Sequence, residues 1–184
     1  MELTDSREIA ADRATVWAAL LDAGVLQSCI PGAQEVTGSP EEGFQAVVVQ
    51  KVGPVKATFR GAVTLSDRVE GESLVLAGEG KGGAAGFAKG EARVRLEDSD
   101  AGTTLHYEVE AKVGGKLAQL GSRIIDGFAK KMADEFFTRF QTTLGGAPEG
   151  ADAEAADAAA AEAGADTGEA APKKGWLGRL TSRG

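Results

Sequence analysis

Alternation of apolar and polar side chains over residues 35–115 is the feature that most constrains the fold of this chain. Similar alternation recurs around residues 74–80, 88–96 and 105–113, and turn residues separate the segments. A period of two is typical of β-strands, and hairpin-sized turns join antiparallel neighbours. The pattern therefore predicts an antiparallel meander with one solvated and one apolar face. In residues 55–66 the apolar face contains Val55, Ala57, Phe59, Gly61, Val63 and Leu65.

The segment before this meander has a different pattern. Residues 1–9 alternate well enough for a first strand, with Leu3, Asp5, Arg7 and Ile9 on one side. Apolar residues then follow at helical spacing, with Asp12 as the expected N-cap and Gly24 as the expected end. A second short helix is expected up to Pro31-Gly32, because proline cannot continue a helix.

One long helix is expected after the meander. Apolar residues recur every three or four positions over residues 116–144, which predicts a helix roughly 40 Å long. It must cover the apolar face of the sheet, since nothing else in the chain can. The predicted fold is thus α+β: a curved antiparallel sheet wrapped around a long C-terminal helix, with two short helices after the first strand.

Small residues are concentrated on the predicted inner faces. If they face the helix, they leave an internal apolar cavity, because larger side chains would be needed to fill the space. The alternative is that the sheet closes onto the helix and the glycines mark bends. We expect the cavity. The small residues are Ala57, Gly61, Gly78, Gly80, Ala88, Gly90 and Ala92 on the strands, with Ala118 and Gly121 near the start of the helix.

Charge divides the chain into three predicted regions: a folded domain over residues 1–146, a disordered Ala-rich linker over 147–172 and a tip over 173–184. The linker holds seven acidic residues and no basic one, and the tip holds four basic residues and no acidic one. The net charge of −8 argues against nucleic acid as a partner. No secretion signal or membrane-spanning run is found, so we expect a cytoplasmic protein.

The tip is expected to bind the inner face of the cell membrane peripherally. Placed on a helix, Trp176, Leu177 and Leu180 share one face, surrounded by cations that favour an anionic surface. The alternative is docking on an acidic groove of a partner protein. The predicted membrane-binding residues are Lys173, Lys174, Trp176, Leu177, Arg179 and Leu180.

Four stretches resemble a known family. They are "VWAALLD" with "CIPGAQEV", "KVGPVKATFRGAVTL", "GTTLHYEVEAKVGGKLAQLGSRII" and the Phe136-Phe137 pair. They are similar to the carbon monoxide dehydrogenase G-subunit family, within the START-like, helix-grip superfamily of lipid and hormone carriers. The resemblance covers nearly all of residues 1–145. It implies a protein that accompanies a molybdenum hydroxylase, usually carbon monoxide dehydrogenase, and binds a membrane quinone or tethers the enzyme at the membrane.

No catalytic or metal site is expected. A single His106 and a single Cys29 cannot form a zinc site or a nucleophilic dyad. Residues 78–83 match GxGxxG, but a strand pattern follows where dinucleotide binding needs a helix. We expect instead a flexible hairpin over the cavity entrance. Cys29 is expected to be a small apolar residue near the end of the second helix; the alternative, which the resemblance supports, is that Cys29, Ile30 and Pro31 form a lip over the cavity mouth.

Three functions follow from these expectations. The first is a non-catalytic carrier, with no covalent cofactor, that takes an isoprenoid quinone or similar lipid from the membrane to the hydroxylase. The second is a recruitment or maturation adaptor without ligand transport. The third is an enzyme, for which only Tyr107 and Gln50 offer inward polar groups. The expected ligand-binding residues are Ile30, Phe59, Gly61, Val63, Leu76, Gly78, Ala92, Val94, Tyr107, Leu117, Leu120, Gly121, Ile124 and Phe128.

Overall fold

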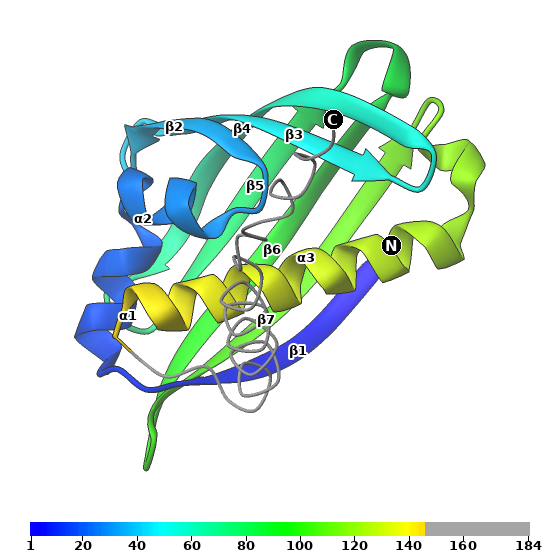
Figure 1. Cartoon of the computed structure of the whole chain (residues 1–184). Coiled ribbons are helices and arrows are strands. Elements are labelled where there is room, and N and C mark those ends of the chain that lie inside the picture. The colour runs from blue at the N-terminus through cyan, green and yellow to red at the C-terminus, as the bar shows by residue number, and fades with distance from the viewer. Residues whose placement is uncertain (146–184) are drawn as a thin grey trace, which may run out of the picture. The chain divides into compact units, whose positions relative to one another are not determined.

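The fold of residues 1–145, which are the residues described by this computed structural model, is a curved sheet around one long helix (Figure 1). Seven antiparallel strands form a single sheet in the order β1-β7-β6-β5-β4-β3-β2. The predicted α+β architecture is confirmed. The elements are β1 (Glu2–Ile9), α1 (Arg13–Leu20), α2 (Ala23–Cys29), β2 (Ala33–Ser39), β3 (Gly43–Val52), β4 (Val55–Val69), β5 (Ser73–Lys81), η1 (Gly83–Ala85), β6 (Phe87–Ser99), β7 (Gly102–Gly114), η2 (Ala118–Leu120) and α3 (Ser122–Thr143).

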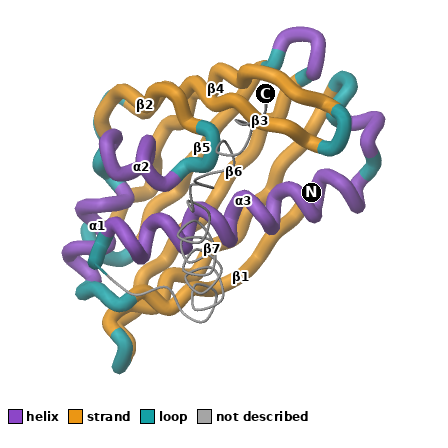
Figure 2. Tube along the Cα trace, viewed as in Figure 1, coloured by secondary structure: helices purple, strands orange, loops and turns teal. Residues whose placement is uncertain are grey.

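The strand register agrees with the faces predicted from alternation. Exposed and half-buried residues alternate along β4 as far as Ser66. Across β4, β5 and β6, Gly61 faces Gly80, which faces Ala88. The sheet curls around α3 (Figure 2). Along β4, the half-buried apolar residues share one face and the exposed polar residues share the other.

Some of the inward glycines lie in close contact with neighbouring strands. A Cβ added to Gly90 would clash with the backbone oxygen of Glu110, and one on Gly78 would lie 3.0 Å from the Val63 side chain. These glycines therefore allow neighbouring strands to approach closely. Gly80 differs, because its Cβ would meet nothing within 4 Å.

Two aspartates begin the two short helices. Asp12 caps α1 by accepting from the Thr15 amide at 3.2 Å, and Asp22 caps α2 by accepting from the Val25 amide at 2.9 Å. Hydrogen bonds from Thr15 lower the pKa of Asp12. The expected end of the first helix at Gly24 is wrong: α1 ends at Leu20, and Gly24 lies inside α2. The Asp22 cap is the signal that separates the two helices.

The long helix begins six residues later than its apolar spacing predicts, at Ser122 instead of Lys116. Gly121 adopts a φ of +87°, which interrupts the helix between η2 and α3. Leu117 is buried before the break, and its amide donates to the Ala85 carbonyl at 3.0 Å. The 22 residues of α3 span about 33 Å.

The dense core lies at one end of the sheet. It joins α1 and α2 to the C-terminal half of α3, where Phe136 stacks on Phe140 with ring centroids 5.6 Å apart. The largest side chains that are less than 2% exposed all belong to this end: Phe140, Ile9, Leu105, Val16, Thr103 and Cys29. Close packing between sheet and helix is therefore concentrated where the two short helices add their side chains.

The segment between α2 and β2 is fixed by Gly32. Gly32 has a φ of +76°, and a Cβ there would clash with the Val49 carbonyl oxygen. The Gly32 carbonyl accepts from the Val49 amide at 2.9 Å, which ties the chain after Pro31 to β3. Only glycine fits both the conformation and the close approach.

We expect Gly32→Ala to destabilise the fold by about 3 kcal/mol or more, because it adds a backbone clash to the cost of a positive φ. Gly71→Ala is the matched control, since Gly71 has a φ of +72° and open space around its Cβ. It should cost only about 1 kcal/mol. Urea unfolding measures both, and equal losses would contradict the close approach at Gly32.

Candidate functional site

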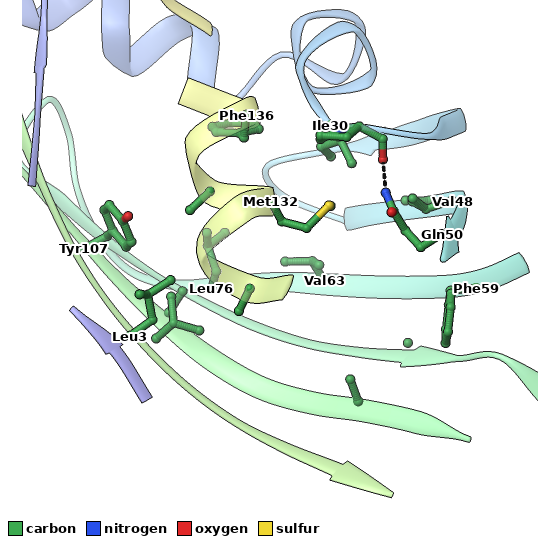
Figure 3. A pocket seen from close by; sticks show the side chains of 18 of the residues that line it. Leu3, Ile30, Val48, Gln50, Phe59, Val63, Leu76, Tyr107, Met132 and Phe136 are labelled. Carbon is green, nitrogen blue, oxygen red and sulfur yellow. Dashed lines mark hydrogen bonds between the residues drawn. The ribbon is translucent and has the colours of Figure 1, made fainter. Parts of the chain in front are cut away.

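A pocket of about 640 Å³ lies between the concave face of the sheet and α3 (Figure 3). Among the residues that the structure describes, no charged side chain lines it. Its walls are aliphatic and aromatic, contributed by β1, α1, α2, all the later strands and α3. The lining includes Leu3, Leu26, Ile30, Val48, Phe59, Val63, Leu76, Ala88, Ala92, Val94, Val109, Leu117, Ile125, Phe128, Met132 and Phe136.

The pocket lies where small residues face the helix. Gly80, Ala88 and Ala92 line it from two adjacent strands, and the space beside Gly80 is open. At one end the Phe59 ring packs over Gly82, where an added Cβ would clash with the ring. Opposite the sheet, Met132 projects from α3 into the pocket (Figure 3). The free volume thus follows from side-chain size on the strands.

Two uncharged polar side chains, Gln50 and Tyr107, lie on opposite sides of the pocket (Figure 3). Gln50 Nε2 donates to the Pro31 carbonyl, which holds the segment of Ile30 and Pro31 against β3. Tyr107 is 5% exposed and stacks on Phe137, with centroids 5.2 Å apart. Its hydroxyl oxygen accepts from Arg7 Nη2 at 3.4 Å.

Arg7 forms a charged cluster behind Tyr107. It makes an ion pair with Asp134 of α3, a second one with Asp5 at 3.1 Å, and lies 5.5 Å from the centre of the Phe137 ring. Its Nε is buried without a hydrogen-bond partner among residues 1–145. Burial would lower the pKa of Arg7, but hydrogen bonds to Tyr107 and Asp134 outweigh it and raise the pKa. The cluster fastens β1 to one flank of α3.

The other flank of α3 borders an open groove. The groove holds about 460 Å³ between the β3–β4 turn and α3, and it shares Gln50, Phe128 and Met132 with the pocket. Lys51, Gly53, Ile124 and Lys131 also line it. The two spaces share walls between β3 and α3, and we infer that the mouth of the pocket lies there.

Nine of the fourteen residues expected to contact a ligand line the pocket: Ile30, Phe59, Val63, Leu76, Ala92, Val94, Tyr107, Leu117 and Phe128. Gly80 of β5 lines the pocket, whereas the expected set contains Gly78 of the same strand. That these nine residues contact a ligand stays a prediction.

The remaining five expected residues, Gly61, Gly78, Leu120, Gly121 and Ile124, do not line the pocket. Gly61 and Gly78 lie against neighbouring strands, with an added Cβ 3.4 Å from the Glu79 carbonyl and 3.0 Å from Val63 respectively. Leu120 and Ile124 lie near Gly53 at the groove, and Ile124 is 41% exposed. The residues of α3 that line the pocket include Ile125, Phe128, Met132 and Phe136, all of which follow the late start of the helix.

Sequence reasoning missed Arg7 and Gln50 as organising residues. Arg7 is a cation on the apolar side of the first strand, and Asp134 is its acidic partner on the helix. A charged side chain on an apolar face needs a partner of opposite charge. That requirement is the signal from which a pairing of Arg7 with Asp134 could have been predicted. For Gln50 the sequence suggests only an inward polar group, whereas the structure shows its amide donating to the Pro31 carbonyl.

Neither His106 nor Cys29 lines the pocket. His106 Nε2 lies 3.0 Å from a Glu97 oxygen on the outer face of the sheet. Cys29 is fully buried in the core beside Thr143, with Sγ and Oγ1 3.6 Å apart, and burial raises the pKa of its thiol. Of the predicted lip, Ile30 and Pro31 line the pocket, but Cys29 does not.

The glycine-rich segment 78–83 belongs to a strand and a tight turn. Gly78 and Gly80 lie in β5, and the η1 turn that follows contains the buried Ala85. Strand β6 follows η1, so no helix N-terminus is present there for a dinucleotide. The Ala85 carbonyl accepts from the Leu117 amide, which anchors η1 to the segment before α3. The flexibility expected of this hairpin stays a prediction.

Within residues 1–145 no group of three His, Cys, Asp or Glu side chains could hold a metal ion. In the same part of the chain no helix is long and apolar enough to cross a membrane. The linker over residues 147–172 and the membrane-binding tip over 173–184 lie outside the described residues, and they stay predictions.

Solved structures share this arrangement of sheet and helix. A conserved protein from Geobacillus kaustophilus has a TM-score of 0.73 at 28% identity, with 79% of this chain and 95% of that chain covered. A START superfamily protein from Mycobacterium smegmatis has a TM-score of 0.58 at 14% identity, with 78% and 96% covered. A protein from Chromobacterium violaceum has a TM-score of 0.58 at 15% identity, with 78% and 96% covered. The fold is therefore of the START-like, helix-grip class.

The family follows from the sequence itself. The model of the carbon monoxide dehydrogenase G-subunit (CoxG) family matches residues 6–145, so the chain belongs to that family. The predicted resemblance is confirmed. A search of curated proteins gave no significant match.

We expect the Arg7–Asp134 pair to couple by about 1 kcal/mol in a double-mutant cycle of Arg7→Met and Asp134→Asn. The side chains are 24% and 48% exposed, so solvent weakens the pair without abolishing it. Arg13 and Asp98 are the control pair, at 3.4 Å and with exposures of 37% and 74%. Their coupling should stay below about 0.5 kcal/mol. Equal couplings, measured by urea unfolding, would contradict a fastening role for Arg7.

Proposed function

We propose that this protein is a non-catalytic carrier that binds an isoprenoid quinone, or a similar membrane lipid, and delivers it to a molybdenum hydroxylase of the carbon monoxide dehydrogenase type. The observation that carries the proposal is the pocket of about 640 Å³ with an apolar lining and two uncharged polar groups. Its volume falls in the range of pockets that hold small-molecule ligands. An apolar pocket of this size favours an occupant that is itself apolar.

The polar groups of the pocket suit a ligand with carbonyl oxygens. A quinone ring offers acceptors and no donor. The Tyr107 oxygen accepts from Arg7, which leaves the hydroxyl hydrogen available to a ligand, whereas Gln50 Nε2 already donates to Pro31. We therefore place the ring near Tyr107 and direct the isoprenoid tail toward the groove at Phe128 and Met132.

Carrying rather than converting the ligand agrees with the pocket chemistry. No charged side chain from residues 1–145 faces the ligand space to act as an acid or base. The quinone would be held without a covalent bond, and the mouth between β3 and α3 would let it enter and leave.

The partner and the membrane contact come from other observations. The family name associates its members with carbon monoxide dehydrogenase, which supports a hydroxylase of that type as the receiving enzyme. The cations and the Trp and Leu residues of residues 173–184 support peripheral contact with an anionic membrane on the cytoplasmic side. The adaptor function remains the competing proposal, and ligand binding separates the two.

The direct test is extraction of a quinone from vesicles by the purified full chain. After vesicles are removed, the quinone left with the protein is extracted and quantified. Gly80→Leu should lower the amount severalfold, because its side chain enters the open space beside Gly80. Ala77→Leu is the control, since Ala77 is exposed on the same strand and outside the pocket lining. Equal retention by both variants would contradict binding in the pocket.

The same assay tests the position of the ring. Tyr107→Phe keeps the aromatic ring but removes the hydroxyl, and should weaken quinone retention by about two- to tenfold. Retention of an isoprenoid hydrocarbon, which has no carbonyl, should not change. If both ligands are affected equally, the hydroxyl does not bind the quinone ring.

A further inference from the structure

Positive charge gathers at one end of the outer sheet face. Six exposed basic residues from five strands form this group, which we call the cationic band: Lys51, Lys56, Arg60, Lys81, Lys89 and Lys112. The strand register sets three pairs of them directly opposite each other: Lys51 faces Lys56, Arg60 faces Lys81, and Lys89 faces Lys112. Like charges in facing positions destabilise a sheet.

Few carboxylates offset the cationic band. Glu79 lies within it, opposite Lys89, and makes an ion pair with Lys81 at 3.4 Å, the only one of the band within residues 1–145. The next row of the same face is acidic, with Glu91 opposite Glu110 and Glu110 opposite Glu2. In a chain of net charge −8, cations are thus separated from most anions on one face. Such an arrangement favours an anionic partner.

Exposed apolar side chains occur at the same end. Phe87 is 48% exposed and begins β6, opposite Gly114 and beside Lys81 in the register. Ile124 is 41% exposed and lies near the Gly53 turn. Phe87 directly follows the β5–β6 connection, and Ile124 lies in the first turn of α3. The β3–β4, β5–β6 and β7–α3 connections gather at one end of the sheet (Figure 1, Figure 2).

The mouth of the pocket opens at this end too. Lys51 belongs to the cationic band and also lines the groove, together with Gly53 and Ile124. A surface that contacts this end would therefore face the route into the pocket. Lysine amines favour lipid phosphates, and isolated exposed apolar side chains between cations suit insertion at the headgroup boundary.

We propose that the cationic band, with Phe87 and Ile124, is a membrane-docking face of the folded domain that sets the pocket mouth against an anionic phospholipid surface. It is distinct from the contact proposed for residues 173–184. The inference deepens the proposed function, on which it rests for its purpose, but docking itself requires no quinone. A protein partner with an acidic surface is the competing occupant, and the test separates the two.

The test is flotation of the full chain with quinone-free vesicles of phosphatidylcholine, alone or mixed with phosphatidylglycerol. Lys173, Lys174, Arg179 and Arg183 are changed to Gln throughout, so that binding through the tip is reduced. On this background the triple variant Lys56→Gln, Lys89→Gln and Lys112→Gln should bind the mixed vesicles roughly 100-fold more weakly. The part of the vesicle binding that the triple variant lacks should weaken as salt is added. It should not occur with vesicles of phosphatidylcholine alone.

The matched control removes three cations elsewhere. Arg93→Gln, Arg95→Gln and Arg139→Gln change the net charge equally but leave the cationic band intact, so vesicle binding should fall far less. Phe87→Ser with Ile124→Ser changes no charge and should weaken binding about tenfold. Circular dichroism spectra and melting curves show that each variant is folded.

Two outcomes would overturn the docking face: equal weakening of vesicle binding by the two triple variants, or unchanged vesicle binding by the band variant. If the band variant keeps its vesicle binding but loses binding to the purified hydroxylase, the band belongs to a contact with a protein partner. Because the vesicles contain no quinone, failure of docking leaves quinone retention to be judged separately. Failure of quinone retention likewise leaves the flotation result standing.

Discussion

The structure depends on one constraint: a single helix, α3, covers the concave face of seven antiparallel strands. At the end where α1 and α2 add their side chains, aromatic and aliphatic groups fill the space around Phe140 and Trp17. Toward the other end, small residues such as Gly80 and Ala92 face the helix, and the space remains open. The pocket is thus a consequence of unequal filling under one helix, and its apolar lining selects an apolar occupant.

The two flanks of α3 differ, and this difference sets the direction of access. On the β1 side, Arg7 pairs with Asp134, and Gln141 donates to the Glu8 carbonyl at 2.9 Å. On the β3 side, a groove separates α3 from Gln50 and Lys51. In the proposed carrier, the ligand would enter beside β3 while the helix remains fastened to β1. The cationic band begins at that same edge, which joins the access route to a surface suited to lipid headgroups.

Much of the fold could be predicted because alternation and helical spacing are local properties of the sequence. The strands from Val55 onward, the Asp12 cap and the apolar face of the long helix follow from these periods. The break at Gly121 could not be predicted, since apolar spacing continues across it and only its backbone conformation interrupts the helix. After the break, Ile125 and not Ile124 lines the pocket. Alternation also predicts that Gly61 and Gly78 line the pocket, and they do not. Alternation indicates only which face of the sheet a residue lies on. Whether open space lies beside the residue depends on contacts between neighbouring strands.

The central claim is that the pocket carries a membrane quinone or a similar lipid. The most direct measurement is native mass spectrometry of the full chain purified from its own host, with organic extraction to identify what is bound. The account predicts one isoprenoid quinone or similar lipid per chain, retained at high salt because apolar contacts hold it. A chain that is empty after gentle purification, and that takes up no such lipid when it is offered, would contradict the account and favour the adaptor function.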